Sequence, residues 1–202
     1  MPMEPEARIL YYRLFAHLLG VHPRHWDRPR LADIVSGLER PGCLEQACSR
    51  LEHSLRSCSE EALLEEYHAV FVGLVRGEVL PYGSWYLSGE LMGRSLVRLR
   101  SDLAFLGIER RPETREPEDH AGCLLESMAL LVDTHGRNGE ARAAAFFEEH
   151  IASWMERFFT DLKRAPSASC FAVLAEAGRC FLLEENKHWG SRQTAAVDGS
   201  RQ

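Results

Sequence analysis

The stretch REPEDHAGCLLESMALLVDTHG, residues 115–136, joins a charged opening to an apolar helical pattern. Its spacing places His120, Leu124 and Leu131 on one face of a helix. Pro117 suits the first helical position, where its missing N–H removes no hydrogen bond. The sequence therefore predicts a helix that opens at Pro117 and turns an apolar face, with His120 at its rim, toward a core.

Three acidic residues crowd the opening of this helix. Glu116 precedes a proline, so we expect it to be extended. Glu118 and Asp119 are expected in the first turn, where carboxylates interact favourably with the helix dipole. Asp119 can also reach back to a free N–H, as in a capping box. Helix capping explains the acidic residues but does not explain His120. A histidine at the rim of a core is usually a hydrogen-bonded structural residue.

Helical periodicity continues through most of the chain. With no convincing strand alternation or repeat, the pattern predicts an all-α, compact single-domain bundle of about seven to nine helices over residues 1–188. Residues 189–202 lack a large apolar cluster and are expected to be a disordered tail. The other helices are expected near 5–22, 29–36, 42–57, 59–71, 89–106, 140–162 and 167–184.

Composition limits the possible functions of the 202-residue chain. Its net charge of −6 argues against a nucleic-acid binder, which normally has a basic face. No window reaches about 18 apolar residues, so we expect no membrane-spanning helix. The first 20 residues lack the basic start of a secretory signal. None of the six cysteines forms a CxxC pair, so reduced thiols in the cytoplasm are expected.

The segment GLVRGEVLPYGSWYLSG, residues 73–89, interrupts the helical pattern with four glycines and one proline. Loops are normally polar, so a loop this apolar is expected to pack on the core or on a ligand. Its large apolar and aromatic residues are Leu74, Val75, Val79, Leu80, Tyr82, Trp85, Tyr86 and Leu87.

A metal site is the main alternative that the residues suggest. Two E-x-x-H steps, Glu65 with His68 and Glu185 with His188, match part of a di-iron helical bundle, but no partner glutamates stand out. His22 and His25 have no evident third ligand. No nucleophile motif such as G-x-S-x-G is present, so a hydrolytic enzyme is not favoured.

Three motifs follow one another along the chain: an aromatic helix end, a P-x-x-S-x-Y loop and an E-P-x-D-H helix opening. Their residues are Tyr67 and Phe71, then Pro81, Ser84 and Tyr86, then Glu116, Pro117, Asp119 and His120. In this order the motifs resemble the TorD/DmsD family, the cytoplasmic chaperones of molybdenum enzymes, and the similarity covers roughly residues 5–185.

The resemblance implies a binding protein without catalytic residues, cofactor or metal of its own. Members bind the twin-arginine leader or the apoprotein of a molybdopterin oxidoreductase until its cofactor is inserted, and occur as monomers or domain-swapped dimers. The peptide-binding residues it implies are Tyr67, Phe71, Leu80, Pro81, Tyr82, Ser84, Trp85, Tyr86, Glu116, Pro117, Asp119 and His120.

The chemistry of a twin-arginine leader agrees with these residues. Its guanidinium groups require carboxylates, which Glu116, Glu118 and Asp119 can supply. Its apolar stretch requires an apolar groove, which the 73–89 segment can supply. On this interpretation His120 holds Asp119 in place. The alternatives are a di-iron bundle with a redox or catalytic role and a helical scaffold that binds no leader peptide.

Overall fold

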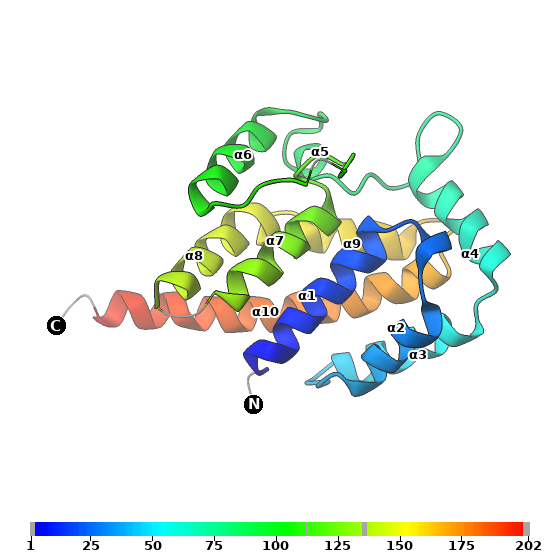
Figure 1. Cartoon of the computed structure of the whole chain (residues 1–202), viewed down its shortest axis with the longest axis horizontal. Coiled ribbons are helices and arrows are strands. Elements are labelled where there is room, and N and C mark those ends of the chain that lie inside the picture. The colour runs from blue at the N-terminus through cyan, green and yellow to red at the C-terminus, as the bar shows by residue number, and fades with distance from the viewer. Residues whose placement is uncertain (1–2, 112, 135–136, 200–202) are drawn as a thin grey trace.

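The computed structural model describes residues 3–111, 113–134 and 137–199, and this part of the chain is predominantly helical (Figure 1). The predicted all-α class is confirmed, with ten α-helices in the described residues. The helices are α1 (Pro5–Gly20), α2 (Arg28–Gly37), α3 (Leu44–Ser57), α4 (Glu60–Tyr67), α5 (Gly83–Ser88), α6 (Arg94–Leu106), α7 (Ala121–Asp133), α8 (Arg137–Phe147), α9 (Met155–Arg164) and α10 (Cys170–Gly199).

Helices α1 and α7 form the most extensive helix pair, and α10 runs along the length of the molecule beside them (Figure 1). Two glycines permit the close crossing of α1 and α7. A Cβ atom added at Gly122 would lie 2.9 Å from the Cα of Gly20 and 3.0 Å from the carbonyl oxygen of Ala16. The small residues that follow the E-P-x-D-H motif therefore serve helix packing.

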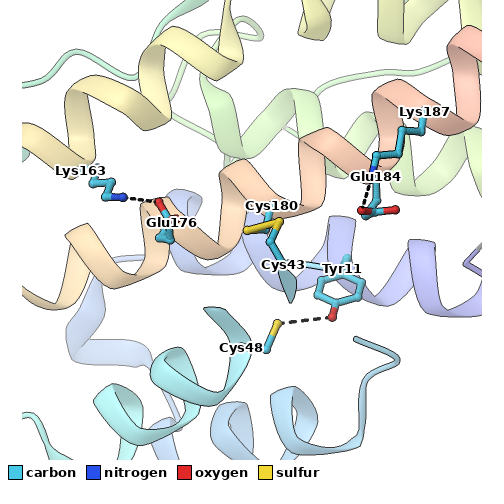
Figure 2. Close-up of a disulfide and its surroundings, with 8 residues drawn as sticks. All are labelled: Tyr11, Cys43, Cys48, Lys163, Glu176, Cys180, Glu184 and Lys187. Atoms are coloured by element: carbon cyan, nitrogen blue, oxygen red, sulfur yellow. Dashed lines mark hydrogen bonds and ion pairs between the residues drawn. A yellow bond between two sulfur atoms is a disulfide. The ribbon is translucent and has the colours of Figure 1, made fainter. Parts of the chain in front are cut away.

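Stacked aromatic rings join α1 to α10 in the core. Tyr11 and Phe15 lie 5.2 and 5.7 Å from Phe181, measured between ring centroids. The α2–α3 pair packs against the same helix, and a disulfide between Cys43 and Cys180 links the start of α3 to α10 (Figure 2). The expectation that all six thiols are reduced is therefore wrong, because the fold brings together two cysteines that are 137 residues apart.

A buried ion pair also ties α1 to α10. Arg8 donates two hydrogen bonds to Glu185, from Nε to Oε1 at 2.7 Å and from Nη2 to Oε2 at 2.6 Å. The hydroxyl of Tyr12 and the indole N–H of Trp189 also donate to Oε2, at 2.6 and 3.1 Å. Burial of this carboxylate is thus offset by four donors.

Two predicted helices have other bounds in the structure. The helix expected near 140–162 is interrupted by a π-helical turn at Glu148–Ala152 and by the non-helical backbone of Trp154, whose indole N–H donates to the carbonyl of His150 at 2.7 Å. The helix expected near 89–106 begins only at Arg94. The short α5 precedes it, inside the segment expected to be a loop.

The last helix is longer than the sequence pattern predicts. α10 continues to Gly199, beyond the boundary drawn at residue 188, and Trp189 is buried in the core. That boundary stays a prediction, and residues 200–202 lie outside the described residues. In the described part of the chain, no helix combines the length and apolar character needed to span a bilayer.

Candidate functional site

The P-x-x-S-x-Y loop and the E-P-x-D-H motif cross each other through their backbones. The N–H of Ala121 donates to the carbonyl of Pro81 at 2.8 Å, and the N–H of Gly83 donates to the carbonyl of Asp119 at 2.9 Å. These bonds flank an isolated antiparallel bridge between residues 82 and 120. Two motifs about thirty-five residues apart therefore form one unit.

This pairing displaces the start of α7. The helix begins at Ala121 rather than at Pro117, so the predicted first turn and capping box are wrong. His120 is the N-cap residue, with an extended backbone, and its Nδ1 accepts a hydrogen bond from the N–H of Gly122 at 3.1 Å. The backbone near Asp119 cannot enter a helix because it is bonded to the neighbouring segment.

Asp119 caps a different helix from the one expected. Its side chain is buried, and its Oδ2 accepts a hydrogen bond from the N–H of Ser84 at 2.8 Å, in the first turn of α5. The Ser84 hydroxyl in turn accepts from the N–H of Met92 at 3.1 Å. Among the described residues, no hydrogen bond joins the side chains of Asp119 and His120, so the expected support of one by the other is also wrong.

His120 is held in its neutral form. Its Nδ1 accepts a hydrogen bond, which places the ring proton on Nε2. Burial lowers the pKa of His120, and the negative charges of Glu116 and Asp119 only partly oppose this effect. Its ring packs edge-on against Tyr82, with centroids 5.4 Å apart.

The three acids of the motif have different environments. Asp119 is internal, whereas Glu118 is paired with Arg100 at 2.9 Å and lies 3.9 Å from Arg110. Glu116 is partly exposed, and its Oε2 accepts a hydrogen bond from the hydroxyl of Tyr82 at 2.7 Å. In the described residues, no arginine or lysine forms an ion pair with Glu116.

Aromatic residues of the α4 end lie close to Glu116. Burial raises the pKa of Tyr67, and the nearby carboxylate of Glu116 raises it further. The Tyr67 ring lies 4.7 Å from His22 and 5.5 Å from Phe71, while Phe71 packs edge-on against Phe171 at 5.0 Å. The structure thus gathers Tyr67, Tyr82, Glu116 and His120, although they come from three segments of the chain.

The remaining loop residues border a hollow of about 280 Å³ beside α9. The Tyr86 hydroxyl donates to Asp161 at 3.1 Å, and its ring stacks on Trp154 at 5.4 Å, which anchors it. Trp85 is partly exposed, with the Arg76 guanidinium 5.6 Å from its ring centroid. The hollow is lined by Arg76, Gly77, Glu78, Val79, Leu80, Trp85, Tyr86, Asp161, Arg164, Ala165 and Pro166.

Two parts of this arrangement differ from the sequence analysis. Leu74 and Val75 are fully exposed rather than packed, because the loop turns away from the bundle between Gly73 and Gly77. Asp161 was not identified from the sequence, since a single acid on a surface helix carries no distinguishing pattern.

One of the two E-x-x-H steps of the metal alternative, Glu185 with His188, is bound by an arginine. Both oxygens of Glu185 accept hydrogen bonds from Arg8, and Nε2 of His188 lies 2.8 Å from Nη1 of the same arginine. Within the described residues, no three or more histidine, cysteine, aspartate and glutamate side chains are grouped to hold a metal ion. The geometry therefore gives the di-iron interpretation no support.

Comparison with known proteins places the chain in a family. Residues 41–160 match the family model described as nitrate reductase delta subunit, which is more than half of the chain. The chain belongs to this family. The predicted resemblance to the TorD/DmsD proteins is confirmed by relatives within it.

Two curated relatives illustrate the similarity. The chain is 25% identical over 176 residues to a probable Tat proofreading chaperone DmsD of Haemophilus influenzae, covering 82% of this chain and 83% of that protein. It is 25% identical over 156 residues to the chaperone protein TorD of Vibrio cholerae O1, strain El Tor Inaba N16961, covering 72% and 69%.

A solved structure supports the fold. The crystal structure of a redox enzyme maturation protein from Archaeoglobus fulgidus matches with a TM-score of 0.64 at 20% identity, covering 86% of this chain and 93% of the other. At this identity the match shows a common fold. The all-α bundle of this chain is therefore a fold that it shares with that protein.

Proposed function

We propose that this protein is a cytoplasmic chaperone that binds the twin-arginine leader, the apoprotein, or both, of a molybdopterin-dependent oxidoreductase. It holds this client for cofactor insertion before export and catalyses no reaction itself. Its membership of the family and the names of its relatives, Tat proofreading chaperone and chaperone, support this role.

The observation that carries the proposal is the state of Glu116. Tyr82 fixes one oxygen of its carboxylate, and within the described residues no hydrogen bond to the other oxygen, Oε1, is found. The half-exposed rings of Tyr67 and Tyr82 lie beside it. An arginine of the leader can donate to Oε1 while its planar guanidinium stacks on an aromatic face. Glu116 replaces Asp119 as the acid that we propose for this contact.

The apolar part of the leader requires a separate surface. Leu80 and Trp85 border the hollow beside α9, on the chain segment that leads into Tyr82 and out of it. A peptide whose arginine contacts Glu116 can therefore extend its apolar residues along this segment. Pro81 and Ser84 shape the segment through backbone and hydroxyl bonds, and we assign them a positioning role.

Titration calorimetry with a synthetic leader tests this assignment. The peptide carries two adjacent arginines followed by about 12 apolar residues, the usual length of such a stretch. We expect Glu116→Gln to weaken its binding by about 1–3 kcal/mol, the contribution of a hydrogen bond to a charged group. Trp85→Ala should weaken it by about 2 kcal/mol, as truncated aromatic anchors do.

Glu126→Gln is the matched control, because Glu126 is an exposed glutamate on α7 that pairs with Arg111 at 3.6 Å. It should bind the peptide like the unmodified protein. A second control replaces the two arginines of the peptide by lysines, which lack the forked donor geometry. Equal affinity of Glu116→Gln and Glu126→Gln for the twin-arginine peptide would remove Glu116 from the site.

A further inference from the structure

Four of the six cysteines lie at the two ends of the contact between α3 and α10. Cys43 immediately precedes α3 and is linked to Cys180, with the two Cα atoms 5.6 Å apart (Figure 2). Cys58 immediately follows α3, and Cys170 is the first residue of α10. Each end of α3 therefore carries a cysteine, and each has a counterpart on α10.

The second pair shares one small cavity. Cys58 and Cys170 both line a small pocket of about 10 Å³, together with Leu55 of α3 and Leu174 of α10. The pKa of the Cys170 thiol is raised to about 12, chiefly by burial and also by the neighbouring Cys58 thiol. The two thiols are thus neighbours within the packed contact, although no disulfide joins them.

We propose that Cys58 and Cys170 are a dithiol oxidation site, which a small disulfide such as oxidised glutathione converts into a second cross-link between α3 and α10. The Cys58 thiol loses its proton to water, and its sulfur attacks one sulfur of the small disulfide, releasing one thiolate. The sulfur of Cys170, after losing its own proton, attacks the Cys58 sulfur and releases the second thiolate. Two S–H bonds are replaced by one S–S bond, and two electrons reduce the small disulfide to two thiols.

The location suits a reversible modification. Thiols of cytosolic proteins are normally kept reduced, and the disulfides that do form there are usually catalytic or redox-sensing. Cys170 is also joined to the aromatic layer beneath Tyr67, because Phe171 packs edge-on against Phe71 at 5.0 Å. Glu66 accepts hydrogen bonds from the N–H groups of both Cys170 and Phe171, at 3.0 and 2.7 Å. A cross-link at Cys170 would therefore hold the start of α10 against α4.

Peptide mapping identifies the cross-link directly. The full chain is reduced, oxidised with glutathione disulfide, alkylated and digested without reductant. We expect one linked peptide pair for Cys43 with Cys180 and another for Cys58 with Cys170, while Cys48 and Cys123 are recovered alkylated. Recovery of Cys58 and Cys170 as separate peptides, each alkylated or carrying glutathione, in a sample that contains the Cys43–Cys180 link would overturn the proposal.

Thermal unfolding gives an independent measurement. The variant Cys170→Ser keeps the Cys43–Cys180 pair, and Cys123→Ser is the matched control at a partly buried cysteine on α7. Oxidation should raise the Tm of the unmodified protein and of Cys123→Ser by about 5–15 °C more than that of Cys170→Ser, because one additional loop is closed, through residues 43–58 and 170–180. An equal rise in all three proteins would show that Cys58 and Cys170 form no cross-link.

Discussion

The carboxylates of Glu185, Glu116 and Asp119 are all hydrogen-bonded, but their partners differ in charge. Arg8 supplies a bidentate cation to Glu185, and the pair is buried in the core. Among the described residues, the carboxylate of Asp119 accepts only from the backbone N–H of Ser84, and the carboxylate of Glu116 only from the Tyr82 hydroxyl. The negative charge of Glu185 is therefore neutralised by an arginine of the same chain. Within the described residues no cation pairs with Glu116, and under the proposed function this leaves its carboxylate for a cation of the partner.

The largest expected effect is the loss of the internal cation. Arg8→Ala should lower the free energy of unfolding by about 3–5 kcal/mol, because it leaves the buried charge of Glu185 uncompensated. Urea denaturation followed by circular dichroism measures this change. Arg13→Ala on the same helix is the control, since the Arg13–Asp133 pair is exposed and should contribute less than about 1 kcal/mol. A similar cost for both variants would contradict the contrast.

Asp119 should show an intermediate effect on stability. Asp119→Ala leaves the N–H of Ser84 without its acceptor, so the free energy of unfolding should fall by about 1–3 kcal/mol. Asp119→Asn keeps an acceptor oxygen and should cost less. Both are measured by the same urea denaturation. If Asp119→Asn lowers the free energy of unfolding as much as Asp119→Ala does, the negative charge of Asp119, rather than its hydrogen bond, stabilises this region.

The pH dependence of stability sharpens the contrast at His120. Its pKa is lowered in the folded protein relative to an unfolded value of about 6.5, so the unfolded chain binds more protons in the window below that value. Its contribution to stability is therefore fully present above about pH 6.5. It is lost as the pH falls toward the folded pKa, with a slope of up to about 1.4 kcal/mol per pH unit.

The variant His120→Asn isolates this contribution, because Asn is a good N-cap residue but does not titrate. Urea denaturation between pH 5 and 8 should show a steeper loss of stability for the unmodified protein than for the variant. The pKa of His17 is also lowered by burial, but this contribution is common to both proteins and cancels in the difference. Parallel pH curves would mean that His120 does not titrate differently on folding.

The smallest expected effect concerns the hydroxyl that orients Glu116. Tyr82→Phe removes one donor to a partly exposed carboxylate and should lower the free energy of unfolding by about 0.5–1.5 kcal/mol. Its binding of the twin-arginine peptide should fall less than that of Glu116→Gln, since the carboxylate itself remains. A greater loss of binding for Tyr82→Phe would assign the main contact to the tyrosine instead.

Local patterns in the sequence determined the helical class and much of the site. Periodic apolar residues located α1, α3 and α7, and the helix expected near 59–71 begins directly after Ser59, whose hydroxyl accepts from the N–H of Ala62. The three family motifs were found because each is short and continuous. These features depend on residues within a few positions of each other, which is the range over which helix propensity and capping act.

Only the tertiary structure decided what each acid does. The start of α7 at Ala121, the capping of α5 by Asp119 and the Tyr82–Glu116 bond all follow from backbone pairing between residues 80–84 and 116–121. The Cys43–Cys180 disulfide likewise joins residues 137 positions apart. A sequence read locally assigns a carboxylate to the nearest helix end, whereas in the folded chain the carboxylate bonds the donor that packing brings within reach.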